Sequence, residues 1–171
     1  LRQPNDPQGL LVPIGPQGTG ARAIEVLDPL CPACRGFEER IEASGLDARM
    51  RRKALLFPLD SECNWMVDHA IHPGACAVTE AILCAGNRGE EVLRWALSEQ
   101  QSIRENAARN PGSAAAAMGR QFPDLRACIG SASVRARVNR SLRWAVTNQL
   151  PVLTPQLYVE GTRLCDADTD L

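Results

Sequence analysis

The sequence has 171 residues, 44% of them hydrophobic, and its 19 basic and 20 acidic side chains leave a net charge of −1 at pH 7. This length and apolar content fit one domain with a hydrophobic core. The near-neutral charge excludes the basic surface typical of nucleic-acid-binding proteins, and no apolar run reaches the roughly eighteen residues that a membrane-spanning helix needs.

The first twenty residues are rich in Pro, Gly and Gln. This composition predicts a linker or tether over 1–20, with the apolar stretch Leu10–Ile14 as a candidate edge strand. The chain opens at Leu1 without a charged leader followed by an apolar stretch. We therefore expect a processed form or an excised domain, with the folded domain over 21–171.

The first regular elements are predicted between residues 21 and 57. Ala21–Leu27 is a short apolar run typical of a buried strand. A helix is predicted from Cys31 to Gly45, with Pro32 in its first turn, and a second strand is predicted to end at Lys53–Phe57. Strand, helix and strand in this order predict a βαβ unit with parallel pairing.

A loop over 60–72, holding a half-buried Trp65, leads into a helical region over about 73–149. Helical patterns cover Pro73–Ala85, Glu90–Arg109, an alanine-rich segment after Gly112, Pro123–Ile129 and Ser133–Asn148. The chain then returns to β structure, because Leu153–Val159 and Thr162–Cys165 flank a glycine and read as a hairpin. These elements predict an α/β fold with a large all-helical insertion between the βαβ half and the C-terminal hairpin.

Seven cysteines are many for a reduced cytosolic protein, and an odd number leaves at least one thiol unpaired in a monomer. Cys31 and Cys34 have the C-x-x-C spacing, whereas the other five are scattered. A zinc ribbon would need a second close pair. The pattern therefore favours an oxidising compartment, which means a periplasmic or other extracytoplasmic location.

The Cys31-Pro32-Ala33-Cys34 motif follows a predicted strand and opens a predicted helix. Unpaired backbone N–H groups and the helix dipole at a helix N-terminus stabilise an anion, so the Cys31 thiolate is favoured. Such a thiolate attacks disulfides, and Cys34, one turn inside the helix, is placed to resolve the mixed disulfide. The alternative interpretation is that the two cysteines form half of a zinc site, or that they are two thiols packed in the core.

A strand, C-P-x-C at a helix start, a second strand, a helical insertion and Thr-Pro before a hairpin resemble the thioredoxin superfamily, in particular its DsbA-like branch. The segments FPLDSECNWMVDHAIHPGACAVTEAILCAG and LPVLTPQLYVEGTRLCDADTDL further resemble thioredoxin-like domains associated with bacterial vitamin K epoxide reductase homologues. The resemblance covers about residues 21–171. It implies a thioredoxin-like fold with a central mixed sheet, and thiol–disulfide oxidoreductase activity.

The resemblance also implies roles for individual residues. Pro155 matches the proline that is cis in this superfamily and faces the active-site disulfide, and Thr154 would present its backbone to substrate. Glu25 matches a buried acid that moves the proton of the resolving thiol. The alternatives are an ordinary edge-strand proline and a solvent-facing glutamate. The remaining predicted substrate-contacting residues are Pro32 and Ala33, between the two cysteines.

The other cysteines are candidates for structural disulfides. An oxidising compartment favours a Cys63–Cys76 bond, and Cys128 can pair with Cys165 if the last short helix lies beside the hairpin. Cys84 is then the buried free thiol, because about 12 Å of helical rise separates it from Cys76. A further alternative is a metal site built from Cys63, His69, His72 and Cys76, whose spacing matches no common zinc finger. Because the spacing matches no common zinc finger, we expect His69 and His72 to be surface residues of a loop.

The sequence thus predicts a thiol–disulfide oxidoreductase in which Cys31, Cys34 and Glu25 are catalytic. It predicts no organic cofactor and no metal. Expected partners are extended or unfolded protein substrates and a membrane quinone-linked oxidase of the vitamin K epoxide reductase type, with a tether supplied by a segment before residue 1. The rival functions are a non-catalytic thioredoxin-fold binding or assembly module and the metal-binding module.

Overall fold

The fold is described from a computed structural model, which describes residues 1, 2, 6 and 9–164. Within them a five-stranded mixed sheet has the order β1-β3-β2-β4-β5. Its strands are β1 (Val12–Ile14), β2 (Ala21–Leu27), β3 (Met50–Leu56), β4 (Gln156–Val159) and β5 (Thr162–Arg163). β2 and β3 are parallel, and the other neighbouring pairs are antiparallel.

The predicted βαβ unit is present and positions the cysteine motif. β2 is the central strand and leads through a turn into α1 (Pro32–Ser44), which ends at Gly45 with a left-handed φ of 74°. A short 3-10 turn (Leu46–Arg49) then enters β3. The motif therefore lies at the carboxyl end of the central strand, where α1 begins.

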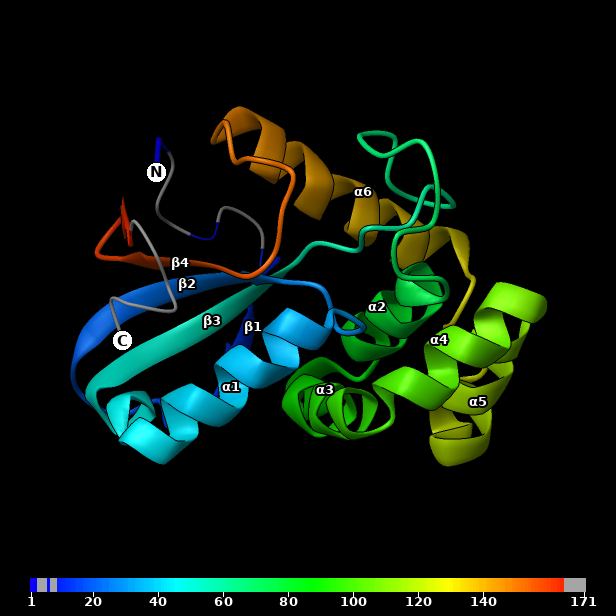
Figure 1. The fold of residues 1–171 in the computed structure, drawn as a ribbon, viewed down its shortest axis with the longest axis horizontal. Coiled ribbons are helices and arrows are strands. Elements are labelled where there is room, and N and C mark those ends of the chain that lie inside the picture. The colour runs from blue at the N-terminus through cyan, green and yellow to red at the C-terminus, as the bar shows by residue number, and fades with distance from the viewer. Residues whose placement is uncertain (3–5, 7–8, 165–171) are drawn as a thin grey trace.

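Five helices separate β3 from β4, as the predicted insertion requires (Figure 1). They are α2 (Ala75–Cys84), α3 (Gly89–Ser98), α4 (Gln100–Arg109), α5 (Ser113–Gln121) and α6 (Ala132–Thr147), with 3-10 turns at Gly86–Arg88 and Pro123–Leu125. The single helix predicted over Glu90–Arg109 is wrong. It is broken at Glu99, whose backbone (φ −108°, ψ 11°) leaves the helical region, and α4 begins in a new direction with the buried Gln100.

Helices cover both faces of the sheet, with α1 on one side and α6 on the other (Figure 1). On the α1 side, Phe37 and Ile41 pack against Ala23, Met50 and Leu157 in a small core. The other side joins the helical insertion in one large hydrophobic core. None of the helices in the described part of the chain combines the length and apolar character needed to cross a membrane.

The candidate edge strand within Leu10–Ile14 is confirmed. This segment contains β1, the edge strand that the apolar run suggested, and it pairs antiparallel with β3, Val12 opposite Ala54. Its side chains join the large core, and Ile14 is only 1% exposed. The reason is that an apolar strand beside the open edge of β3 gains both ladder hydrogen bonds and burial.

Candidate functional site

Cys31 and Cys34 are free thiols at the start of α1. Cys31 is the N-cap residue, and its Sγ accepts a hydrogen bond from the Cys34 N–H at 3.4 Å. Pro32 occupies the first turn, and both Pro32 and Ala33 are exposed. Cys31 is 4% exposed, whereas Cys34 is fully buried, so the first sulfur is the one nearer to solvent.

The two thiols have pKa values shifted in opposite directions. Hydrogen bonding with the Cys34 side chain, assisted by Thr154, the Cys34 N–H and the charge of His72, lowers the pKa of Cys31 to about 6 against the effect of burial. Burial, followed by the neighbouring Cys31, raises the pKa of Cys34 well above its ordinary value. At neutral pH Cys31 is therefore mainly a thiolate nucleophile, while Cys34 keeps its proton.

The segment before β4 lies against Cys31. The Thr154–Pro155 peptide bond is cis, and the Thr154 carbonyl oxygen lies 3.8 Å from Cys31 Sγ, where it accepts the proton of the sulfur when Cys31 is in its thiol form. The buried Gln156 holds this segment in place, because its side-chain amide donates to the carbonyls of Pro151 at 2.9 Å and Leu153 at 2.7 Å. Residues far apart in the sequence thus meet at the cysteine pair.

Helix α4 also contacts the active-site turn. Gln100 donates from its side-chain amide to the carbonyls of Pro29 and Cys31, at 3.0 and 2.8 Å. Arg104, one turn later, donates to the Leu30 carbonyl at 2.7 Å. Neither residue stands out in the sequence, because polar side chains near the start of a helix are ordinarily solvated.

A buried carboxylate, Asp28, closes the turn between β2 and α1. Its oxygens accept the backbone N–H groups of Leu30 and Leu59, both at 2.8 Å, and it lies 2.7 Å from His72 Nδ1. The expectation of two surface histidines is therefore wrong for His72, whose side chain is 13% exposed, although His69 is 71% exposed. The sequence itself indicates for Asp28 only a position between the predicted strand and the cysteine motif.

Glu25 is buried on the central strand, so the solvent-facing alternative is wrong. Its carboxylate pairs with the fully buried Arg52 at 2.7 Å, and Arg52 also bonds Glu38 on α1 at 2.6 Å. Burial and the nearby Glu38 raise the pKa of Glu25 well above its ordinary value, although Arg52 opposes them. The direct partner of this carboxyl group is Arg52, and its role as a proton relay for Cys34 stays a prediction.

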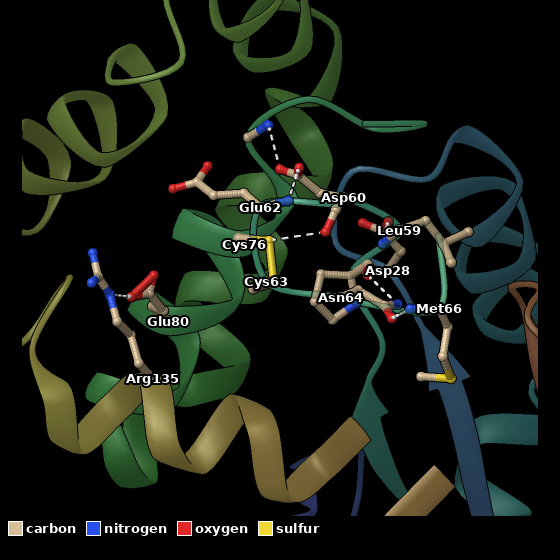
Figure 2. The surroundings of a disulfide bond; sticks show 12 residues. Asp28, Leu59, Asp60, Glu62, Cys63, Asn64, Met66, Cys76, Glu80 and Arg135 are labelled. Carbon is tan, nitrogen blue, oxygen red and sulfur yellow. Dashed lines mark hydrogen bonds and ion pairs between the residues drawn. A yellow bond between two sulfur atoms is a disulfide. The ribbon is translucent and has the colours of Figure 1, made fainter. Parts of the chain in front are cut away.

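Among the described residues, two disulfides lie outside the cysteine pair. The predicted Cys63–Cys76 bond is present and joins the loop after β3 to the first turn of α2 (Figure 2). The prediction that Cys84 is a free thiol is wrong, because Cys84 forms a second disulfide with Cys128. The end of α2 lies beside the turn that follows α5, which places the two Cα atoms 5.9 Å apart. Cys165, the partner predicted for Cys128, lies outside the described residues.

The proposed metal ligands are not arranged as a metal site. The sulfurs of Cys63 and Cys76 are bonded to each other, His72 contacts Asp28, and His69 contacts Asp68 on the surface. A disulfide sulfur is not the thiolate that zinc requires. Trp65, in the same loop, is 53% exposed.

Comparison with known proteins gives structural matches. No protein-family model matches the sequence, and no curated protein is significantly similar to it. The chain is similar to a thioredoxin-like oxidoreductase from Silicibacter pomeroyi DSS-3, with a TM-score of 0.62 and 20% identity over 95% of this chain and 86% of that one. It is also similar to MdbA, a thiol-disulfide oxidoreductase from Corynebacterium matruchotii (TM-score 0.64, 12% identity, 95% and 86% covered).

A third solved structure, alpha-DsbA1 from Wolbachia pipientis, matches with a TM-score of 0.65 and 15% identity over 90% of this chain and 76% of that one. All three matches have low sequence identity, so they are evidence for the fold alone. Together with the mixed sheet and the helical insertion, they show that this chain has the thioredoxin-like fold of the DsbA-like thiol–disulfide oxidoreductases.

Proposed function

We propose that this chain is a thiol–disulfide oxidoreductase that exchanges disulfides with protein substrates through Cys31 and Cys34. The observation that carries the proposal is the geometry at the start of α1. A low-pKa Cys31 caps the helix, Cys34 is buried one turn inside it, and the Thr154 carbonyl lies against the Cys31 sulfur. This arrangement suits attack by the first sulfur and resolution by the second.

The exchange balances as two displacements. The Cys31 thiolate attacks one sulfur of a substrate disulfide, forming a mixed disulfide while the other substrate sulfur leaves as a thiolate. Cys34 then loses its proton and attacks the Cys31 sulfur, which releases the second substrate thiolate and leaves the Cys31–Cys34 disulfide. The substrate gains the two electrons that the cysteine pair loses, and the reverse sequence oxidises a substrate dithiol.

We favour the oxidising direction. A lowered Cys31 pKa stabilises the reduced enzyme, and a stabilised reduced form makes the disulfide a stronger oxidant. The substrate would be an extended or unfolded protein segment that contacts Thr154, Pro155, Pro32 and Ala33. In support, Pro32 and Ala33 are exposed at the start of α1, and the apolar Val152 and Leu153 are exposed on the loop that carries Thr154.

The cellular setting follows from the same proposal. Two disulfides besides the redox pair are typical of an oxidising compartment, so we place the protein outside the cytoplasm. The reduced pair then needs an electron acceptor. From the sequence resemblance we propose a membrane quinone-linked oxidase of the vitamin K epoxide reductase type, with the chain tethered by a segment before residue 1.

Turnover of a peptide with two cysteines in a glutathione buffer tests the function. The wild-type chain is expected to accelerate disulfide formation, and Cys34→Ser is expected to accumulate a mixed disulfide with the peptide, because attack occurs without resolution. Cys31→Ser is expected to do neither. A mixed disulfide on Cys31→Ser but not on Cys34→Ser would reverse the two roles, and no acceleration by the wild type would favour the binding module.

A further inference from the structure

The two histidines of this chain lie three residues apart but in different surroundings. His69 is on the surface, with its side chain 71% exposed and bonded to Asp68. His72 is 13% exposed, and it contacts the buried carboxylate of Asp28. Asp68 is a surface residue, whereas Asp28 belongs to the active-site turn. This difference makes the histidines a natural pair of test and control positions.

His72 is held from two directions. Its backbone N–H donates to the Leu59 carbonyl at 3.0 Å, and its Nδ1 lies 2.7 Å from Asp28 Oδ2. The same Asp28 oxygen also accepts the backbone N–H of Leu59, so the Leu59 backbone and the His72 side chain contact one carboxylate oxygen. With Nδ1–H donating to Asp28, the second proton of the imidazole is gained and lost at Nε2.

Asp28 in turn is part of the turn that carries the nucleophile. Its other carboxylate oxygen accepts the Leu30 N–H, and its backbone carbonyl accepts the Cys31 N–H at 3.1 Å. The histidine is therefore fastened to the turn that presents the Cys31 sulfur. The residues between the two cysteines, Pro32 and Ala33, carry no charge.

We propose that His72, held on the active-site turn by the positioning residue Asp28, is the cationic partner that stabilises the Cys31 thiolate. The inference rests on the proposed function and extends it to a residue outside the C-x-x-C motif. A protonated imidazole near a thiolate favours the charged form of both groups. The loop between β3 and α2 thereby becomes part of the chemical machinery.

The charges around His72 agree with this assignment. The charges that act on it are those of Asp28, which contacts it directly, of Cys31 and of Arg104 from α4. Burial lowers the pKa of His72, but the hydrogen bond and charge of Asp28, together with Cys31, outweigh burial and the like charge of Arg104, so its pKa is raised. The coupling is mutual, since the charge of His72 also contributes to the lowered pKa of Cys31.

The pH dependence of Cys31 alkylation tests the proposal. The rate is measured on the full chain with its C-x-x-C pair reduced, using iodoacetamide and mass-spectrometric fragmentation that separates Cys31 from Cys34. His72→Gln is expected to raise the midpoint by about one pH unit, and so to lower the rate at pH 5 about tenfold. His69→Gln is the matched control and is expected to leave the midpoint unchanged.

Reciprocity supplies a second readout that a structural role of His72 would not produce. In Cys31→Ser the thiolate is absent, so the pKa of His72 measured by NMR is expected to fall. Equal alkylation midpoints in His72→Gln and wild type would overturn the proposal even if the peptide is still oxidised. Failure of the proposed function is a different result, namely a wild-type chain without peptide turnover.

Discussion

At the scale of single residues, the chemistry depends on two sulfurs that are three positions apart but differ in burial. Cys31 is the N-cap residue of α1, and its sulfur accepts a hydrogen bond from the backbone N–H of Cys34. Cys34 itself is inside the core. Donors and nearby positive charge favour a thiolate, while burial penalises it. The same motif therefore provides a reactive nucleophile and a protected resolving thiol.

The lowered pKa of Cys31 predicts a pH dependence of stability. A group with a depressed folded-state pKa contributes stability that is full above its unfolded pKa and is lost as pH falls through the folded value of about 6. With an unfolded thiol pKa of about 8.5, the free energy of unfolding of the reduced protein is expected to rise by about 2 kcal/mol between pH 5 and pH 7.5.

Urea denaturation of the protein with reduced C-x-x-C pair at these two pH values measures this rise. Cys31→Ser, examined in the same way, is expected to lack it, because a serine hydroxyl does not ionise in this range. Parallel pH profiles for the wild type and Cys31→Ser would contradict the prediction. The comparison removes the contributions of other titrating groups that the two proteins share.

At the scale of elements, the segment between β3 and α2 links a structural disulfide to the site. The Cys63–Cys76 bond closes a loop that contains His72, and Figure 2 shows that the same region borders Asp28 and Leu59. The 13-residue separation gives about 3 kcal/mol of stabilisation in the chain-entropy model. The bond therefore restrains the backbone that presents His72 to Asp28.

Replacing both Cys63 and Cys76 by serine is expected to lower the free energy of unfolding by about 3 kcal/mol. It is also expected to raise the midpoint of Cys31 alkylation, because the freed loop presents His72 less consistently. The matched control is the Cys84–Cys128 pair replaced in the same way, which closes a 44-residue separation away from His72. That variant is expected to lose about 4 kcal/mol with no shift of the midpoint. Equal midpoints of Cys31 alkylation in the two double variants would show that the Cys63–Cys76 bond does not influence the reactivity of Cys31.

At the scale of the whole molecule, the N-terminal segment belongs to the domain. β1 covers one edge of the sheet beside β3, and Gly15 donates its N–H to Glu90 on α3 at 2.7 Å. The segment thus joins the sheet to the helical insertion. Both halves of the fold meet at the carboxyl end of β2, where the cysteine motif, α4 and the Thr154 loop come together.

Ile14→Ala distinguishes a core segment from a linker. Ile14 is 1% exposed, so its truncation is expected to lower the free energy of unfolding by about 2–5 kcal/mol, as for other buried aliphatic residues. Pro16→Ala, in the exposed connection that follows, is the control and is expected to change it by about 0.5 kcal/mol or less. Chemical denaturation measures the free energy of unfolding of both variants. Equal, small changes would indicate that the segment around Ile14 behaves as a linker and not as part of the core.

The sequence by itself determined the local features of this protein. The βαβ order, the cysteine motif at a helix start, the Cys63–Cys76 bond and the hairpin after Pro155 depend on propensity, turn residues and close spacing, which the sequence displays directly. The site could be anticipated at Cys31, Cys34 and Thr154 because these residues belong to motifs with a recognisable order.

Only the tertiary structure decided the partners that come from distant segments. His72 meets Asp28 across 44 positions, Cys84 meets Cys128 across another 44, and Gln100 reaches the Cys31 carbonyl across 69. The burial of Arg52 between two glutamates is of the same kind. Such contacts are set by how helices pack on the sheet, and packing depends on the shape of all the side chains in the core rather than on any local pattern.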